Sequence, residues 1–493
     1  MKVLLATLAI EPESRNENNR STPYSLGIAY LHASLERSGH QVEALYLNNV
    51  EYTDSEWEFF RRFEEFRPDV VGLQVFSMNR VSTFAAIEKL HALSPDTRIV
   101  LGGIHASLMY AQILEKFPFV VIVVGEGELT LTELLSRMEG RLPISDVHGL
   151  AYYEEGRIRT TPERPLLENL DSLPEPKHEV VFDREPTRYM GHIIASRGCP
   201  FDCSFCCLKA ISKRRCRVRS VEKVVAEITN LKKRYPRLRE VQFHDDTLLL
   251  DNKRVIELCR ALIKADLGLR FSCSARVKPV SDEMFSWMQR AGFQKIMFGL
   301  ETGSPKLLHS IHKKITREDV LELFRVLTPY DFSITTFLMC GFPGEDAATI
   351  EETIALVRAT QRIKYNLIAG IGKLLVYPGT EVYRVMADSG KINDAFWLSD
   401  APVPYFTVEH SLPQLRVFEK RLMDNLSLFN IFTLKGFFLH FMRMPLVIVK
   451  EFLRPRNRGL FLSIVAASAQ RAFPRAYSLA YAGYLRALSR GGN

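Results

Sequence analysis

Residues 192–207 read HIIASRGCPFDCSFCC, in which a short apolar run ends at Gly198 and is followed by closely spaced cysteines. Cys199, Cys203 and Cys206 have the spacing CxxxCxxC. A loop with this spacing can wrap around a cubane iron–sulfur cluster, each thiolate binding one iron. Three thiolates for four irons leave one iron open to another ligand. The stretch therefore predicts a buried strand whose end carries a 4Fe–4S site.

The other cysteines do not extend this pattern. Cys207 is adjacent to Cys206, so its side chain should point away from a cluster, and Cys216, Cys259, Cys273 and Cys340 are expected to be buried or incidental thiols. A structural zinc site is the alternative, but no second ligand pair follows at a suitable spacing. Because four of the eight cysteines crowd together and none precedes Cys199, a reducing cytoplasm suits the chain better than a disulfide framework.

The cysteine stretch opens a series of β/α repeats that begins near residue 191. Its expected strands occupy residues 192–198, 239–245, 269–276, 295–301, 333–340 and 372–379. Helical patterns separate most of these strands. Six such repeats predict a partial (β/α)6 barrel, whose chemistry lies at the carboxyl ends of its strands.

An earlier series of repeats predicts a second α/β domain. Its apolar runs occupy residues 3–9, 42–47, 69–76, 98–103 and 120–125, with amphipathic helical patterns between them. Near-continuous apolar strands indicate a doubly wound, Rossmann-like parallel sheet that is covered on both faces. Such sheets bind ligands beyond the carboxyl ends of their strands. Ser77, Gly102, Gly103 and the segment Gly125-Glu126-Gly127 follow strands there, so this domain is expected to bind a ligand.

We therefore expect an α/β chain of four parts. They are a Rossmann-like domain (1–145), a hairpin turning near Glu155-Gly156 and a linker (146–190), the partial barrel (191–400) and an α-helical C-terminal extension (401–493). No stretch is long and apolar enough to cross a bilayer. The opening residues predict a buried strand rather than a secretory signal.

The positive charge of the chain is concentrated in its C-terminal part. The whole chain has a net charge of +8, whereas 411–493 contain 13 Lys and Arg residues against three acidic ones. An amphipathic surface that touches anionic lipid is one interpretation, and a helical cap over the barrel mouth is the other. The basic and aromatic residues do not interleave as a stacking platform, so no nucleic acid is expected as a partner.

In the motif RGCPFDCSFCC this sequence resembles the radical S-adenosylmethionine (SAM) superfamily, including the aromatic Phe205 before the third cysteine. The resemblance covers about 191–385. It implies that the open iron chelates SAM and that an electron from the cluster breaks the sulfonium bond. A reducing electron donor such as flavodoxin or ferredoxin would supply that electron.

The same resemblance implies SAM contacts at the ends of successive barrel strands. VQFHDDTLL, CSAR, GLETGS, FLMCGFPGE and VYPGT supply them in order. The expected contacts are Phe205, Asp245, Asp246, Ser274, Arg276, Glu301, Gly341 and Tyr377. The glycines of the usual GGE form are absent before Asp245.

Residues 1–140 resemble the cobalamin-binding domain that precedes many radical SAM barrels, through STPYSLGIAYLHASLERSGH, IVLGGIHAS and VGEGELTLTELL. The expected cobalamin contacts are Thr22, Ser25, Ser77, Gly102, Gly103, His105, Gly125, Glu126 and Gly127. The DxHxxG motif of enzymes that ligate cobalt through histidine is missing, so His105 is expected to pack or hydrogen-bond near the ring. A vestigial domain without cobalamin is the alternative.

Both resemblances together imply a cobalamin-dependent radical SAM methylase that acts on an unactivated carbon of a small-molecule or lipid-type intermediate. The main alternative keeps both cofactors but closes a ring or rearranges the substrate. A non-catalytic cobalamin or iron–sulfur sensor is a more remote alternative. The expected location is the cytoplasm, with the C-terminal part peripheral to a membrane if it binds lipid.

Overall fold

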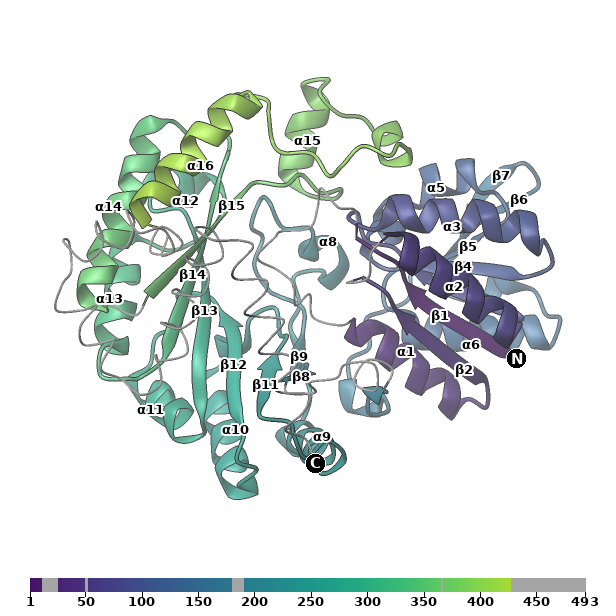
Figure 1. Cartoon of the computed structure of the whole chain (residues 1–493), viewed down its shortest axis with the longest axis horizontal. Coiled ribbons are helices and arrows are strands. Elements are labelled where there is room, and N and C mark those ends of the chain that lie inside the picture. Colours follow the sequence, from purple (N-terminus) through teal and green to yellow (C-terminus); the bar gives the residue numbers. More distant parts are fainter. Residues whose placement is uncertain (11–24, 49–51, 180–189, 365–366, 427–493) are drawn as a thin grey trace, which may run out of the picture.

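Two β-sheets built mainly from parallel strands, each with its own helices, lie side by side (Figure 1). The structure is a computed structural model, and it describes residues 1–10, 25–48, 52–179, 190–364 and 367–426. The ends of the two series of strands meet at a shared crevice, which contains the candidate site.

The first sheet confirms the predicted doubly wound domain. Its parallel strands are β1 (Lys2–Thr7), β2 (Gln41–Tyr46), β3 (Val70–Gln74), β4 (Arg98–Gly102) and β5 (Val121–Val123). They stand in the order β2-β1-β3-β4-β5. The helices are α1 (Leu26–Arg37), α2 (Tyr52–Phe66), α3 (Arg80–Leu93), α4 (Ile104–Leu108), α5 (Tyr110–Lys116) and α6 (Gly127–Glu139).

Strand β1 shows why this sheet is apolar on both faces. Val3 and Leu5 pack in a cluster with residues of α1 and α6. Leu4 and Ala6 point the other way, into a cluster with residues of α2 and α3. Successive side chains of a strand alternate between its faces, so a strand covered on both sides must be apolar throughout.

The predicted hairpin is present, but it belongs to the first sheet. Its strands β6 (Leu150–Glu154) and β7 (Arg157–Thr160) flank a turn at Glu155 and Gly156, both with positive φ. Strand β6 pairs antiparallel with β5 and so extends the sheet to seven strands. The hairpin is therefore an edge of the first domain rather than part of a linker. Two short 3-10 helices, η2 (Ile144–Asp146) and η3 (Leu170–Ser172), flank it.

The second sheet is the predicted partial barrel, six parallel strands that do not close. The strands are β8 (Met190–Ile193), β11 (Glu240–Phe243), β12 (Arg270–Ala275), β13 (Phe293–Glu301), β14 (Ser333–Cys340) and β15 (Leu367–Lys373). The helices are α8 (Leu208–Ser212), α9 (Val221–Arg234), α10 (Asn252–Ala265), α11 (Asp282–Arg290), α12 (Pro305–Ser310), α13 (Arg317–Leu327), α14 (Ala347–Ile363) and α15 (Glu381–Asp388). Smaller elements are η4 (Leu248–Leu250) and a two-stranded ribbon of β9 (Ser196–Arg197) and β10 (Arg217–Val218).

The position predicted for the sixth strand is wrong by about one strand length. The expected run was 372–379, whereas β15 ends at Lys373 and pairs with β14 from Leu367 onward. Gly370 and Gly372 interrupt the apolar alternation of the true strand, while Leu374 to Val376 read as a strand although they follow it.

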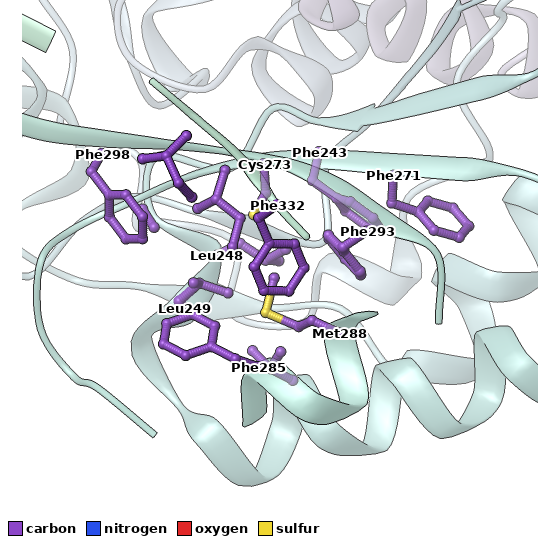
Figure 2. Packing of buried hydrophobic residues seen from close by; sticks show 14 of the residues in the cluster. Phe243, Leu248, Leu249, Phe271, Cys273, Phe285, Met288, Phe293, Phe298 and Phe332 are labelled. Atoms are coloured by element: carbon purple, nitrogen blue, oxygen red, sulfur yellow. The ribbon is translucent and has the colours of Figure 1, made fainter. Parts of the chain in front are cut away.

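The helix-covered face of the second sheet holds a cluster of buried aromatic residues. Figure 2 shows Phe243, Phe271 and Phe293 beside one another on three neighbouring strands, with Phe285 on the covering helix α11. The ring centroids of Phe243 and Phe293 lie 5.7 Å apart. Aromatic pairs at this separation stabilise a core beyond the area that they bury.

The barrel helices begin at capping residues that the sequence supplies. Ser220, Asp251 and Ser281 each accept a hydrogen bond from a backbone N–H of the first turn of α9, α10 and α11. Thr316 and Asp346 form capping boxes at the starts of α13 and α14. Each cap satisfies N–H groups that have no partner within the helix.

A segment after the barrel ties the two domains together. Residues 394–406 contain η5 (Asp394–Leu398), in which Trp397 is fully buried. The Arg80 guanidinium, from α3, donates to the carbonyl oxygens of Trp397, Ser399 and Ala401. Because an unpaired buried guanidinium would be costly, these bonds fix the segment against the first domain.

The C-terminal extension is described only to residue 426. Helix α16 (Leu412–Leu426) places Leu422 and Leu426 in the barrel core. The aromatic and basic residues on which the membrane interpretation depends lie in 427–493, outside the described residues. Within the part that the structure describes, no helix is both long and apolar enough to span a membrane.

The turn after β14 is held by a buried carboxyl group. Glu345 is 3% exposed and accepts hydrogen bonds from the backbone N–H of Gly341, whose φ is +100°. Burial raises the pKa of Glu345 to about 7, although the backbone N–H groups of Gly341 and Phe342 act in the opposite direction. The folded chain therefore retains this proton at pH values where an unfolded chain has released it.

We predict a specific pH dependence from this turn. The pKa of Glu345 is raised from 4.5 to about 7 in the folded chain. The stabilisation that comes from protonated Glu345 is therefore complete below pH 4.5 and is lost as the pH rises through 7. The difference in free energy of unfolding between the native chain and Glu345→Gln should fall by about 3 kcal/mol over that window, measured by urea titration. The exposed Glu352→Gln is the control, and an equal slope for both variants would contradict the assignment.

Candidate active site

A cavity of about 350 Å³ opens where the first sheet faces the barrel. From the first domain its wall includes Gly102, Gly103, Gly125, Glu126 and Gly127, which lie at the end of β4 and after β4 and β5. From the barrel domain its wall includes Arg197, Gly198, Leu208, Ser212, Arg217, His244 and Asp246. One cavity thus joins the predicted cofactor edge of the first sheet to the start of the cysteine loop.

The glycines of the wall leave space that a side chain would fill. A Cβ atom added at Gly102 or Gly125 would meet no atom within 4 Å. Gly103 has φ +95°, and a Cβ there would lie 2.8 Å from the carbonyl oxygen of Val75. Backbone can therefore approach a flat ligand closely along this edge. The buried Ser212 hydroxyl, which has no hydrogen-bond partner among the described residues, offers that ligand a polar contact.

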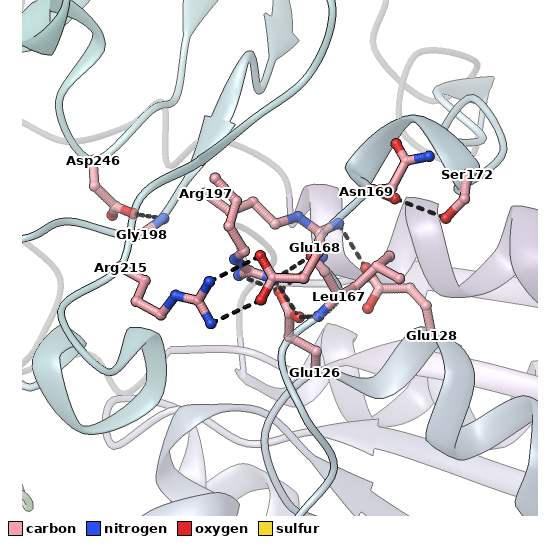
Figure 3. A network of polar contacts seen from close by, with 11 residues as sticks. Glu126, Glu128, Leu167, Glu168, Asn169, Ser172, Arg197, Gly198, Arg215 and Asp246 are labelled. Atoms are coloured by element: carbon pink, nitrogen blue, oxygen red, sulfur yellow. Dashed lines mark hydrogen bonds and ion pairs between the residues drawn. The ribbon is translucent and has the colours of Figure 1, made fainter.

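Charged side chains from both domains meet beside the cavity (Figure 3). Both Glu126 carboxylate oxygens accept from Arg217 at 2.8 Å, and one also accepts from Arg197 at 3.3 Å. Arg197 donates to Glu128 at 2.6 Å as well. We call these four residues, Glu126, Glu128, Arg197 and Arg217, the interdomain clamp.

The clamp has a clear electrostatic reason. Arg197 and Arg217 are directly opposite each other in the β9–β10 ribbon. Like charges at opposite positions repel, so the ribbon needs an acidic partner. Burial alone would raise the pKa of Glu126, but the hydrogen bond from Arg217 and the charge of Arg197 lower it overall. Glu126 is therefore ionised. Its carboxylate already binds both arginines, so a cobalamin contact, as predicted for Glu126, would have to share it.

The cysteine loop follows this ribbon directly. Cys203 is buried, Cys199 and Cys206 are partly buried, and all three are free thiols. Burial raises the pKa of Cys206 to about 12, with a further contribution from its neighbours Cys207, Cys203 and Cys199. The cysteines are therefore close enough for the charge of one thiolate to raise the pKa of another.

The donor set fits a cubane better than a single ion. Among the described residues, no group of three His, Cys, Asp or Glu side chains is arranged to hold one metal ion. A cubane spreads its thiolates over separate irons, so they need not converge on one point. Cys199, Cys203 and Cys206 are the residues that would hold a 4Fe–4S cluster, and this assignment stays a prediction.

The two predicted aspartates at the end of β11 hold the entry to the cysteine loop. Asp245 is buried and accepts from the backbone N–H of Ala195 at 3.0 Å and from the Ser196 hydroxyl. Asp246 accepts from the backbone N–H of Gly198 at 2.9 Å and lines the cavity. Burial raises the pKa of Asp245 to about 6. Both oxygens of Asp245 are thus already used, whereas Asp246 is placed to meet a ligand.

A second polar chain crosses from the cysteine loop to the end of β13. Arg276 donates to the Cys203 sulfur at 3.4 Å and to the carbonyl of Lys313, and its guanidinium carbon lies 3.7 Å from the ring centroid of Phe201. Lys313 in turn donates to Glu301 at 2.7 Å. The predicted pair Arg276 and Glu301 is therefore brought together through Lys313, a residue that the sequence analysis did not single out.

The remaining predicted SAM residues occupy the ends of other barrel strands. Phe205 packs on Phe342, with ring centroids 5.7 Å apart. Ser274 is partly exposed on β12, Gly341 begins the turn after β14, and Tyr377 follows β15. Burial raises the pKa of Tyr377 to about 12, so its hydroxyl stays protonated. Their contacts to SAM stay predictions.

Three of the predicted cobalamin residues, Ser25, Ser77 and His105, do not line the cavity. Ser77 bonds His105 through Nδ1 at 2.9 Å, and the His105 ring packs against Trp397 with centroids 5.3 Å apart. Burial, and then the charge of Arg80, lower the pKa of His105 to about 3, so the ring is neutral. Ser25 directly precedes α1, and Thr22 lies outside the described residues.

The sequence analysis missed the basic residues of this site. Arg197 is a single arginine at the end of an apolar run, whereas Arg217 and Lys313 stand in basic stretches, where a solvated face is the ordinary expectation. Their side chains are only 16%, 6% and 5% exposed. No local pattern marks them, because the carboxylates that bury them lie far away in the sequence or beyond a turn.

Comparisons with known proteins identify the two domains that enclose the cavity. The radical SAM superfamily model matches residues 193–357, and the B12-binding domain model matches 18–135. The chain is therefore a radical SAM enzyme. More specifically, it belongs to the radical SAM enzymes that carry a cobalamin-binding domain, with 4Fe–4S, SAM and cobalamin as cofactors.

Individual relatives extend this comparison. An uncharacterized methyltransferase of Pyrococcus horikoshii is 29% identical over 388 residues, which are 78% of this chain and 83% of that protein. The anaerobic magnesium-protoporphyrin IX monomethyl ester cyclase of Rubrivivax gelatinosus is 28% identical over 345 residues, 67% of this chain and 61% of that protein. The solved structure of the cobalamin-dependent SAM radical enzyme OxsB, with aqua-cobalamin and SAM bound, has a TM-score of 0.72 at 16% identity. It covers 99% of this chain and 75% of OxsB, and it shows the shared fold.

We predict that assembly of the iron–sulfur cluster requires Cys203 but not Cys207. After anaerobic reconstitution the native chain should hold about four irons, since each thiolate anchors a corner of one cubane. Cys203→Ala should lose most of that iron, whereas Cys207→Ala should keep it, as measured by iron and sulfide content. Equal losses in both variants would contradict the assignment.

The clamp yields a second prediction. Glu126→Gln leaves the nearly buried Arg217 without a carboxylate and Arg197 with Glu128 alone, so the free energy of unfolding should fall by about 3–5 kcal/mol. Glu168→Gln is the matched control, because its pair with Arg215 is 62% and 55% exposed and should contribute at most about 1 kcal/mol. Urea titrations of both variants measure the difference, and equal values would exclude a structural role of the clamp.

Proposed function

We propose that this chain is a C-methyltransferase that uses SAM and cobalamin to methylate an unactivated carbon of a small-molecule or lipid-type intermediate. The observation that carries the proposal is the single cavity between the glycine edge of the first sheet and the entry to the cysteine loop. When bound, the cofactors supply one-electron cleavage of SAM and transfer of a methyl group. A methylation of this kind needs both cofactors near one substrate, and a shared cavity brings their binding edges together.

The chain's own residues have the task of positioning. Asp245 and Asp246 hold residues 195–198, and Arg276 fixes Cys203 and Lys313, so the cysteine loop is held from two sides. The clamp fixes the same ribbon to the first domain. Such a rigid arrangement keeps reacting groups aligned and limits access of water.

The open face of the barrel supports a substrate with an apolar part. Phe337 is 44% exposed in the middle of β14. Its partners in the sheet register are Gly299 on β13 and Gly370 on β15, which leave the ring uncovered on both sides. An exposed aromatic ring on a strand offers a surface for apolar or flat ligands.

A second function with the same cofactors is ring formation. The cyclase of Rubrivivax gelatinosus supports it, because that relative is nearly as similar to this chain as the methyltransferase. The methyltransferase is favoured since the match covers more of both chains. A sensor without catalysis would not require the polar contacts at successive strand ends.

Product analysis tests the proposal. The reconstituted chain with cobalamin, SAM, candidate substrates and a reductant such as reduced flavodoxin or ferredoxin should form 5′-deoxyadenosine and a product heavier by one methylene group. With SAM deuterated in its methyl group, the label should appear in that product by mass spectrometry. Cys206→Ala is the control and should form neither.

A product of unchanged or hydrogen-depleted mass would favour ring formation instead. The absence of 5′-deoxyadenosine from a chain with a reduced cluster would favour the sensor. We also propose that the protein is located in the cytoplasm and that residues 427–493 contact an anionic membrane. Pelleting with anionic liposomes tests that contact.

A further inference from the structure

Two histidines of the barrel meet beside the cavity. His192 lies in β8 and His244 follows β11, and these two strands are parallel neighbours. The His192 Nδ1 and His244 Nε2 atoms are 2.6 Å apart, within hydrogen-bond distance. The backbone N–H of His244 donates to the carbonyl of Ile193 at 2.7 Å, which fixes the position of His244 next to β8.

The second ring nitrogen of His244 remains available. His244 lines the cavity, and its Nδ1 has no hydrogen-bond partner among the described residues. The other charged groups of the wall are already paired, Glu126 and Glu128 with the clamp arginines and Asp246 with the backbone of Gly198. His244 is thus a polar side chain of the wall that can still bond a ligand.

Both rings are neutral. Burial, and then the proximity of His244, lower the pKa of His192 to about 3, and burial lowers the pKa of His244 to about 4. A neutral imidazole has one N–H and one acceptor nitrogen. If His244 Nε2 accepts from His192, its Nδ1 is a donor; if it donates, its Nδ1 is an acceptor. The pair can therefore present either a donor or an acceptor to the cavity without carrying charge.

We propose that the His192–His244 pair binds a carboxamide of the corrin ring through His244 Nδ1, with His192 as a positioning residue. A carboxamide offers both N–H and C=O groups, so either tautomer of the pair finds a match. His244 is not a cobalt ligand in this arrangement, because its Nε2 bonds His192 and its Nδ1 bonds the carboxamide. This inference rests on the cobalamin dependence in the proposed function.

Binding of hydroxocobalamin to the full chain, measured by equilibrium dialysis, tests the pair. Loss of one hydrogen bond in His244→Phe should weaken binding about tenfold, whereas His244→Gln should restore it to within about threefold of the native chain. His192→Phe should weaken it about threefold, because His244 is no longer held. The exposed His309→Phe is the matched control and should bind as the native chain does.

Two further readouts separate this role from others. The visible spectrum of bound hydroxocobalamin should be the same in the native chain and in His244→Phe, since no cobalt ligand is removed. Cobalamin in which the bonded carboxamide is replaced by an apolar group should bind the native chain about tenfold more weakly, because it offers His244 Nδ1 neither an N–H nor a C=O group. That discrimination should disappear in His244→Phe, or in His244→Leu should the Phe variant not fold.

The inference is overturned if the native chain binds hydroxocobalamin and His244→Phe binds it equally well. A changed spectrum, which would indicate a cobalt ligand, overturns it too, as does weaker binding of SAM alone. If the native chain itself binds no hydroxocobalamin, the cobalamin dependence of the proposed function fails first, and the two failures are thereby distinguished.

Discussion

The site depends on the carboxylate of Glu126 lying between two arginines. Arg197 and Arg217 face each other in a two-stranded ribbon, and the ribbon leads directly into the cysteine loop. Glu126 belongs to the other domain, at the start of α6. Because the arginines need this carboxylate, the loop is held at a defined position relative to the glycine edge of the first sheet. The geometry of the cavity follows from that one electrostatic requirement.

The other ionised groups near the cysteines serve a similar purpose. Asp245 bonds backbone and a hydroxyl at 195–196, Arg276 bonds Cys203 and a distant carbonyl, and Lys313 bonds Glu301. Buried charges are tolerated only when they are paired or hydrogen-bonded. Here they pair across elements far apart in the sequence, so a catalytic loop without regular structure is nevertheless rigid. His244 differs, since one of its nitrogens remains open toward the cavity.

The fold was predictable wherever a strand or helix has a regular pattern. The apolar run at 3–9 became β1, because a strand covered on both faces has to be apolar throughout. The stretch 239–245 became β11, in which the buried Val241 and Phe243 alternate with polar residues. The rule of apolar strands put the predicted sixth barrel strand too late in the chain, because Gly370 and Gly372 break the apolar pattern of β15. The hairpin was predicted from its turn, but its pairing with β5 depends on which edge of the sheet is free, and local sequence does not contain that information.

By itself, the sequence determined the chemistry of the site: three thiols at cubane spacing, glycines after β4 and β5, and polar residues at the ends of the barrel strands. Spacing and residue type are local properties, so they can be read directly. The tertiary structure alone decided which of these groups meet. It placed Glu126 against Arg217, moved Ser77 and His105 to the side of Trp397, and brought His192 and His244 together. Contacts of this kind depend on the packing of two domains, which no short stretch of the chain encodes.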